Sequence, residues 1–261
     1  MFFDAHFHYA VCVQRNVFDI CRESENKYDL KLDSWKGLSC AHSPDEWIIQ
    51  ENSPDSVFSS FGIHPQIVGN IDVDFYKDFL LGLIKDNKLN GIGEAGFDFF
   101  TEDFKATRDI QEDVWKFQLE LAIKYSLPLI VHCRKGNELL FRDAYKLKKV
   151  PVVLFHSFMG SFVEASSLIK RGINCFFSFG KQVMNNNKKV IDCVKNLPIK
   201  NLLMETDGPF QTLKGEDNTF PSDIVKVYNA VYKLRCDNDN TDLSYEEFCL
   251  KLEENSHRFI K

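Results

Sequence analysis

The chain has 261 residues, of which 44% are hydrophobic, and a formal net charge of −6 at pH 7. This length suits one α/β barrel domain over residues 1–261, because such barrels occupy about 200–250 residues or more. The acidic balance excludes a protein that coats nucleic acid through bulk charge, since those domains usually have a pI above about 9. It does not exclude an enzyme that holds a few phosphates locally.

The sequence shows neither a membrane span nor an export signal. No apolar stretch approaches the ~20 residues that a span needs, and Asp4, His6 and His8 stand where a signal peptide would be apolar. None of the eight cysteines forms a pair with a two-residue gap. A zinc ribbon, a redox motif and a disulfide framework are therefore not expected. We expect a reduced cytoplasmic protein that does not enter the membrane.

Strand-like and helix-like segments alternate along the chain, which favours parallel strands. Strands are expected at 2–8, 37–41, 57–62, 90–95, 128–132, 151–156, 173–178 and 201–206. Apolar residues at helical spacing predict helices at 72–88, 106–126, 137–148, 161–171, 186–196, 221–235 and 244–259. A capping box with proline at Ser43-Pro44-Asp45-Glu46 predicts one more helix start. The pattern predicts an α/β fold, a TIM-type (β/α)8 barrel that is either regular or distorted; the polar stretch 9–36 and the loop 211–221 are not assigned to it.

Several of the predicted strands end in a histidine or an acid. A buried strand that ends in such a residue is costly unless something pairs with it, and barrel strands deliver their ends to one rim. We expect one divided metal site with the ligands His6, His8, Glu94, His132, His156 and Asp207. One cation would have His6, His8, Glu94 and Asp207 around it, and the other Glu94, His132 and His156. Glu94 alone is expected to touch both.

Each of these motifs also has an ordinary interpretation when it is taken alone. His6 and His8 could be surface residues, and Glu94 could be a solvated residue in a glycine-rich turn. His132 could be a satisfied core histidine, and Asp207 before Gly-Pro could be turn chemistry. The convergence of all of them on one barrel rim favours the metal site.

Further residues are expected to support the ligands or to face a substrate. Asp4 is two residues from His6 and is expected to orient a histidine ring. Asp98 is expected either to lie behind the ligands or to be catalytic, and Glu205 is expected to support the local structure. His64 and Arg134 are expected to face the substrate, because a guanidinium suits a phosphate oxygen. His42 and His257 are expected to be ordinary residues at helix ends.

Paired metal sites with ions about 3.5–4 Å apart clamp the attacking and leaving oxygens of a displacement reaction. Phosphodiester hydrolysis has this demand, since it needs an activated water and has a charged transition state. The sequence contains no serine nucleophile elbow, glycine-rich phosphate loop or Cys–His pair that would compete with this interpretation. A metal-dependent hydrolase is the predicted class.

The motifs, taken in order, resemble the TatD-type metal-dependent deoxyribonuclease family, within the amidohydrolase-like barrels. They are Asp4-Ala5-His6-Phe7-His8, Gly62-Ile63-His64-Pro65, Gly93-Glu94-Ala95-Gly96-Phe97-Asp98, Gln118-Leu119-Glu120-Leu121-Ala122, 127–134, 155–160 and 205–209. The resemblance implies a TIM-type barrel that holds two divalent ions, Mg²⁺, Mn²⁺ or Zn²⁺, and hydrolyses DNA, often from a 3′ end.

The resemblance carries the six ligands over residue by residue, with Glu94 and Asp207 as catalytic residues and Asp207 placed to assist the water. It implies that His64 and Arg134 contact phosphate. Two features depart from the family pattern. Lys135 stands where an acidic residue is common, and the basic, proline-rich segment is reduced over 211–218. These departures concern substrate binding and not the metals.

The leading hypothesis is a two-metal hydrolase that cuts DNA phosphodiester bonds as a 3′–5′ exonuclease on single strands or free ends, with RNA as a further substrate. One alternative is a metal-dependent deacylase or amidohydrolase, for example on aminoacyl-tRNA. The other is a barrel that is active only with protein partners in a larger complex, such as a phage-defence assembly.

Overall fold

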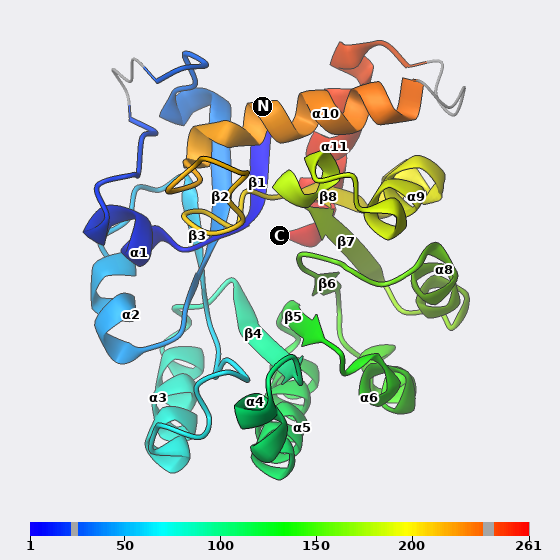
Figure 1. Cartoon of the computed structure of the whole chain (residues 1–261). Coiled ribbons are helices and arrows are strands. Elements are labelled where there is room, and N and C mark those ends of the chain that lie inside the picture. The colour runs from blue at the N-terminus through cyan, green and yellow to red at the C-terminus, as the bar shows by residue number, and fades with distance from the viewer. Residues whose placement is uncertain (22–25, 237–242, 261) are drawn as a thin grey trace.

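Eight parallel strands lie next to one another in chain order, and helices surround them (Figure 1). This arrangement is seen in a computed structural model that describes residues 1–21, 26–236 and 243–260. The strands are β1 (Phe2–Phe7), β2 (Trp35–Ala41), β3 (Val57–Phe61), β4 (Gly91–Asp98), β5 (Leu129–Arg134), β6 (Val153–Phe155), β7 (Cys175–Phe179) and β8 (Leu202–Met204). The predicted (β/α)8 barrel is confirmed, and each predicted strand overlaps an observed one.

The helices follow the strands around the outside of the barrel (Figure 1). They are α1 (Tyr9–Gln14), α2 (Pro44–Gln50), α3 (Val73–Lys85), α4 (Glu102–Ala106), α5 (Arg108–Tyr125), α6 (Asn137–Arg142), α7 (Ala144–Leu147), α8 (Phe162–Lys170), α9 (Lys188–Asn196), α10 (Ile224–Cys236) and α11 (Tyr245–Phe259). The helix predicted at 137–148 is divided into α6 and α7, and the helix predicted at 106–126 corresponds to α5, with the short α4 before it. None of the described helices is both long and apolar enough to cross a membrane.

Apolar side chains fill the barrel beneath the carboxyl ends of its strands. One cluster is made of inward residues of the strands and the end of α11: Phe3, Ala5, Leu38, Cys40, Ile130, Val152, Leu154, Phe176, Leu203, Phe259 and Ile260. Phe259 is 1% exposed and packs edge-on against Phe3 and Phe176. The last helix therefore closes the amino end of the barrel, and the opposite end is left for polar groups.

The seam between β8 and β1 is joined by a few specific hydrogen bonds. The Asp207 N–H donates to the His6 carbonyl at 2.9 Å, and the His8 N–H donates to the Gly208 carbonyl at 2.8 Å. The Asp4 carboxylate accepts from the Thr206 N–H at 2.8 Å and from its hydroxyl at 2.5 Å. These bonds close the barrel at the rim that carries the candidate ligands.

The expectation that Asp4 orients a histidine ring is wrong. The pairing of β1 with β2 shifts between Asp4 and Phe7, so the strict alternation of faces breaks before His6. The Asp4 side chain turns to Thr206, the residue next to Asp207. Asp4 therefore fixes the backbone beside one candidate ligand.

Two glycines let β4 approach β5 closely around Glu94. Gly93 and Gly96 have φ angles of +148° and +143°, which side chains rarely allow. A Cβ on Gly96 would lie 2.0 Å from the His132 carbonyl oxygen, and one on Gly93 would lie 2.5 Å from the Ile130 oxygen. The glycine-rich motif is thus required by the backbone itself.

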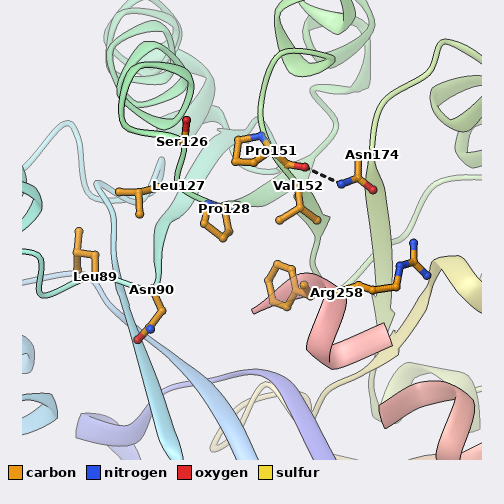
Figure 2. A pocket seen from close by; sticks show the side chains of 10 residues that line it. Leu89, Asn90, Ser126, Leu127, Pro128, Pro151, Val152, Asn174 and Arg258 are labelled. Carbon is orange, nitrogen blue, oxygen red and sulfur yellow. Dashed lines mark hydrogen bonds between the residues drawn. The ribbon is translucent and has the colours of Figure 1, made fainter. Parts of the chain in front are cut away.

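A cavity of 360 Å³ lies at the amino ends of β4 to β7, on the side of the barrel away from the candidate ligands (Figure 2). Its lining is mixed, with Leu127, Pro128 and Val152 beside Asn174, whose amide donates to the Pro151 carbonyl at 2.6 Å. Among the described residues, no histidine or carboxylate lines it. The cavity therefore offers no group for hydrolytic chemistry.

A buried lysine anchors the segment that follows β8. Lys181 is fully buried, and its ammonium group lies 2.5 Å from Glu216 and 2.7 Å from Asp223. Glu216 also pairs with Lys226 at 3.0 Å. This network holds 211–221, for which the sequence predicted no element, against the barrel.

We expect Gly96→Ala to destabilise the protein by more than ~1 kcal/mol, because both the backbone angle and the nearby carbonyl exclude a Cβ. Gly82→Ala is the matched control. Gly82 lies in α3 with nothing within 4 Å of its added Cβ, so this change should stabilise by about 0.5–1 kcal/mol. Urea unfolding of both variants checks this, and equal effects in the two would contradict it.

The Glu216 network predicts a pH-dependent part of the stability. Burial raises the pKa of Glu216, but hydrogen bonds led by the one from Lys181 outweigh it and lower the pKa to about 2. A carboxylate whose pKa is lowered in the folded state stabilises the fold at pH values above its unfolded pKa, which is near 4.5. This stabilisation is lost as the pH falls towards 2. In urea unfolding, the free energy of unfolding of wild type should exceed that of Glu216→Gln most above pH 5. This difference in free energy should become smaller as the pH is lowered. A constant difference would refute this.

Candidate metal centre

Glu94 lies at the centre of a group of histidines at the carboxyl end of the barrel. Its Oε1 atom faces His42 Nε2 at 2.8 Å, His6 Nε2 at 3.2 Å and His8 Nε2 at 3.7 Å. Asp207 Oδ1 closes this side, at 3.3 Å from His8 Nε2 and 3.6 Å from His6 Nε2. One oxygen of Glu94 therefore belongs to a compact set of nitrogen and oxygen donors.

The second oxygen of Glu94 faces a different set of rings. Its Oε2 atom lies 2.5 Å from His156 Nε2, 3.3 Å from His132 Nδ1 and 3.6 Å from His64 Nε2. The His132 and His156 nitrogens are themselves 3.3 Å apart. The two carboxylate oxygens thus divide six of the seven histidines into two groups of three.

The barrel topology explains this convergence. Each of six strands ends near one or two of these groups: β1 at His6 and His8, β2 at His42, β3 at His64, β4 at Glu94, β5 at His132 and β6 at His156. Asp207 follows β8 and has a φ of +52°. Because all the strands are parallel, their carboxyl ends meet at one rim.

Partners on the far side of the rings fix their orientation. His8 Nδ1 lies 3.2 Å from the Cys40 carbonyl, which leaves its Nε2 for the centre. His132 Nε2 lies 3.1 Å from Asp98 Oδ2, which leaves its Nδ1 for the centre. Hydrogen bonds of this kind hold metal-binding imidazoles in a single tautomer. The structure thus places Asp98 behind His132.

The electrostatics favour an ionised Glu94 with neutral His6 and His64 rings, and a His156 ring that gives up a proton when it binds a metal. Burial raises the pKa of Glu94, but the charges of His156 and His6 lower it well below its usual range. Burial lowers the pKa of His6 to about 4 and that of His64 to about 3. Burial also opposes the charge on His156, yet Glu94 raises its pKa to about 9. Neutral rings offer the lone pairs that a metal requires.

The donors fit divalent cations. Four sets, each with one ligand atom per residue within 4.8 Å of the others, occur among the described residues: His6–Glu94–His156, His6–His8–Asp207, His8–His42–Glu94 and His64–Glu94–His132. Imidazole nitrogen and carboxylate oxygen together suit Zn²⁺, Mn²⁺ and related ions. His156 Nδ1 is buried without a hydrogen-bond partner in the described part of the chain, so its Nε2 is the atom turned to the other donors.

His42 was wrongly expected to be an ordinary helix-end residue. It follows β2 directly, as other site histidines follow their strands, and this position was the signal that could have found it. The predicted capping box is only half formed, since Ser43 accepts from the Glu46 N–H but Glu46 accepts from the His42 N–H at 2.7 Å. Glu46 thus holds His42 at the site. His257, in contrast, is exposed on α11.

Gln211, which no sequence motif indicated, binds several groups beside the centre. Its amide nitrogen donates to Ser157 Oγ at 2.8 Å, to Asp207 Oδ2 at 3.1 Å and to Glu205 Oε1 at 3.2 Å. Burial raises the pKa of Glu205 to about 7, although Ser178 donates to it at 2.5 Å. Glu205 therefore lies behind Asp207 and is joined to it through Gln211.

A cavity of 570 Å³ opens above the donors and gives a substrate access to them. Its lining contains His64, Arg134, Met159, Gln182 and Phe210 beside the candidate ligands. The Arg134 guanidinium is 3.6 Å from Asp98 and is 41% exposed, so it can turn to an anion in the cavity. The structure thus brings the predicted phosphate contacts to the same opening as the predicted ligands.

Comparison with known proteins agrees with this arrangement. The family model described as TatD related DNase matches residues 3–261. The chain is 30% identical over 220 residues to the uncharacterized metal-dependent hydrolase YabD of Bacillus subtilis, covering 79% of this chain and 78% of YabD. It is 26% identical to the 3′-5′ ssDNA/RNA exonuclease TatD of Salmonella typhimurium over 59% of this chain and 58% of that protein.

The fold has a counterpart among solved structures. The crystal structure of YJJV, a TatD homologue from Escherichia coli K12, superposes with a TM-score of 0.80 at 22% identity. The match covers 99% of this chain and 97% of that one, so the barrel is shared along its whole length. Together with the family match, the barrel and its ring of metal-binding donors show that the chain belongs to the TatD family of metal-dependent hydrolases.

Proposed function

We propose that this protein is a two-metal phosphodiesterase that removes nucleotides from the 3′ ends of single-stranded DNA. The observation that carries the proposal is the position of Glu94, whose two oxygens each face a separate set of histidine nitrogens. A carboxylate between two such sets is suited to bridge two cations. Two adjacent cations are the arrangement that phosphodiester cleavage uses.

The ligands divide between the two positions along the two oxygens of Glu94. His6, His8 and Asp207 would hold one ion with Oε1, and His132 and His156 the other with Oε2. When bound, two divalent ions (Mg²⁺, Mn²⁺ or Zn²⁺) supply positive charge to the attacking and leaving oxygens. The set is rich in nitrogen, which favours Zn²⁺ or Mn²⁺ over Mg²⁺ in affinity.

The remaining chemistry belongs to side chains of the pocket. Asp207 Oδ1 faces the donors while Gln211 holds its Oδ2; these contacts support a role for Asp207 in taking the proton of the attacking water. His64 and Arg134 line the opening and would bind the phosphate oxygens. Arg134 suits this role because its guanidinium can bind two oxygens of one phosphate.

A free end of a single strand suits this pocket better than the interior of a duplex. The donors lie within a cavity, among buried side chains. A duplex would have to unstack and unpair before a phosphate reached them, at a cost of a few kcal/mol. The Salmonella relative is named as acting on both single-stranded DNA and RNA, so RNA is a second substrate to test.

The central prediction concerns metal and activity together. Wild type should bind two equivalents of Mn²⁺ or Zn²⁺ in a calorimetric titration and release nucleotides from 3′-labelled single-stranded DNA, and chelation should abolish the release. Glu94→Gln should lose one or both equivalents and at least ~100-fold in rate, because it removes the shared ligand. Glu120→Gln, an exposed acid on α5, is the control and should match wild type.

Two results would contradict the proposal. Metal-loaded wild type that releases no nucleotide from DNA or RNA would exclude the nuclease function. If the same preparation cleaved ester or amide substrates, such as aminoacyl-tRNA, the deacylase alternative would replace it. Activity that appeared only after a protein partner was added would favour a subunit of a complex.

His42→Ala tests the residue that sequence reasoning missed. His42 Nε2 lies 2.8 Å from Glu94 Oε1, so its loss should free Glu94 and weaken metal affinity by about 10–100-fold, as for other groups next to a metal site. His257→Ala, exposed on α11, is the control. Metal titration of both variants is the measurement, and equal affinities would show that His42 does not act on the centre.

A further inference from the structure

Two consecutive residues at the end of β5 line two different cavities. Arg134 lines the 570 Å³ cavity above the histidines, and Lys135 lines a neighbouring cavity of 280 Å³. The second cavity is bordered by Phe99, Lys105, Arg108, Lys135 and Glu138. Lys135 has a φ of +60°. This change in backbone direction comes directly after Arg134, the last residue of β5. The cavities therefore adjoin at this point.

An exposed aromatic ring contacts one cation from each of the two cavities. Phe100 is 51% exposed, and the Arg134 guanidinium lies 4.0 Å and the Lys135 ammonium 4.7 Å from its ring centre. Arg108 lies 5.1 Å from the ring centre of Phe99 in the same way. Cation–π contacts of this kind hold charged groups in place without neutralising them. We call Lys105, Arg108, Arg134 and Lys135 the basic rim.

The charge of Lys135 is the least compensated in the basic rim. Lys105 pairs with Glu102 at 2.6 Å, Arg108 with Glu112 at 3.1 Å, and Arg134 with Asp98 at 3.6 Å. Lys135 forms no ion pair with any of the residues that the structure describes. In a chain of net charge −6, a lysine beside the substrate opening that an aromatic ring holds, and that Glu102 offsets only from beyond ion-pair distance, is suited to bind an anion.

We propose that the basic rim binds the backbone of a single-stranded polynucleotide beyond the phosphate at the histidines. The strand would run from the histidine cavity past Arg134 and Phe100 to Lys135, where the next phosphate meets the second cavity. Interleaved basic and aromatic side chains are what single-strand binding uses. This inference rests on the proposed function and adds a second phosphate site to it.

The test compares Lys135→Glu with Lys124→Glu in metal-loaded protein. Lys124 also lies over an aromatic ring, 5.1 Å from Tyr125, but at the far end of α5. The measured quantity is the ratio of kcat/KM for a twelve-nucleotide strand to that for a dinucleotide, with DNA and RNA of one sequence. Wild type should prefer the longer strand by about fivefold or more, and the preference should weaken with salt.

Lys135→Glu should bring this ratio close to one and make the salt dependence shallower by about 0.7 for each phosphate that is no longer neutralised. Lys124→Glu should keep the wild-type ratio. The proposal is overturned if Lys135→Glu keeps that ratio, or if both variants lower it equally. If neither the twelve-nucleotide strand nor the dinucleotide is cleaved, the proposed function fails. Fluorescence anisotropy of a phosphorothioate twelve-nucleotide strand then tests the basic rim. The Kd should rise for Lys135→Glu and stay at the wild-type value for Lys124→Glu; equal Kd values for the two variants would overturn the proposal.

Discussion

One carboxylate between two groups of histidines is the constraint on which the rest of this structure depends. Glu94 is 2% exposed and is surrounded by six imidazoles, an arrangement that would be costly without compensating charge. The backbone brings it there through Gly93 and Gly96, which allow β4 to lie against the carbonyl oxygens of β5. The other end of the barrel is filled by the apolar end of α11. The barrel therefore has a polar centre at the carboxyl ends of its strands and an apolar core at their amino ends.

The seam of the barrel lies at the rim that carries the candidate ligands. The bonds that join β1 to the segment after β8 run through His6, His8 and Asp207, all candidate ligands. Asp4 supports this join through Thr206, and the Lys181 network fixes the loop that carries Gln211. Closure of the fold therefore also positions the groups that would hold the metals.

The sequence predicted the strands and the main candidate ligands because both depend on local patterns. Apolar runs that end in a histidine or an acid indicate strands and rim residues at the same time. It misplaced Asp4 because the pairing shift in β1 changes which way a side chain points. His42 was missed because it also stands just before a predicted helix start, and Gln211 because its contacts depend on how a loop folds back. Such features arise from tertiary packing, which periodicity does not encode.

Bridging of two metal ions by Glu94 is the central claim. Anomalous diffraction from crystals of the protein loaded with Mn²⁺ or Zn²⁺ tests it most directly. We predict two peaks about 3.5–4 Å apart, one at each carboxylate oxygen of Glu94, with His6, His8 and Asp207 around the first and His132 and His156 around the second. A single peak, or a second peak away from Glu94, would contradict it.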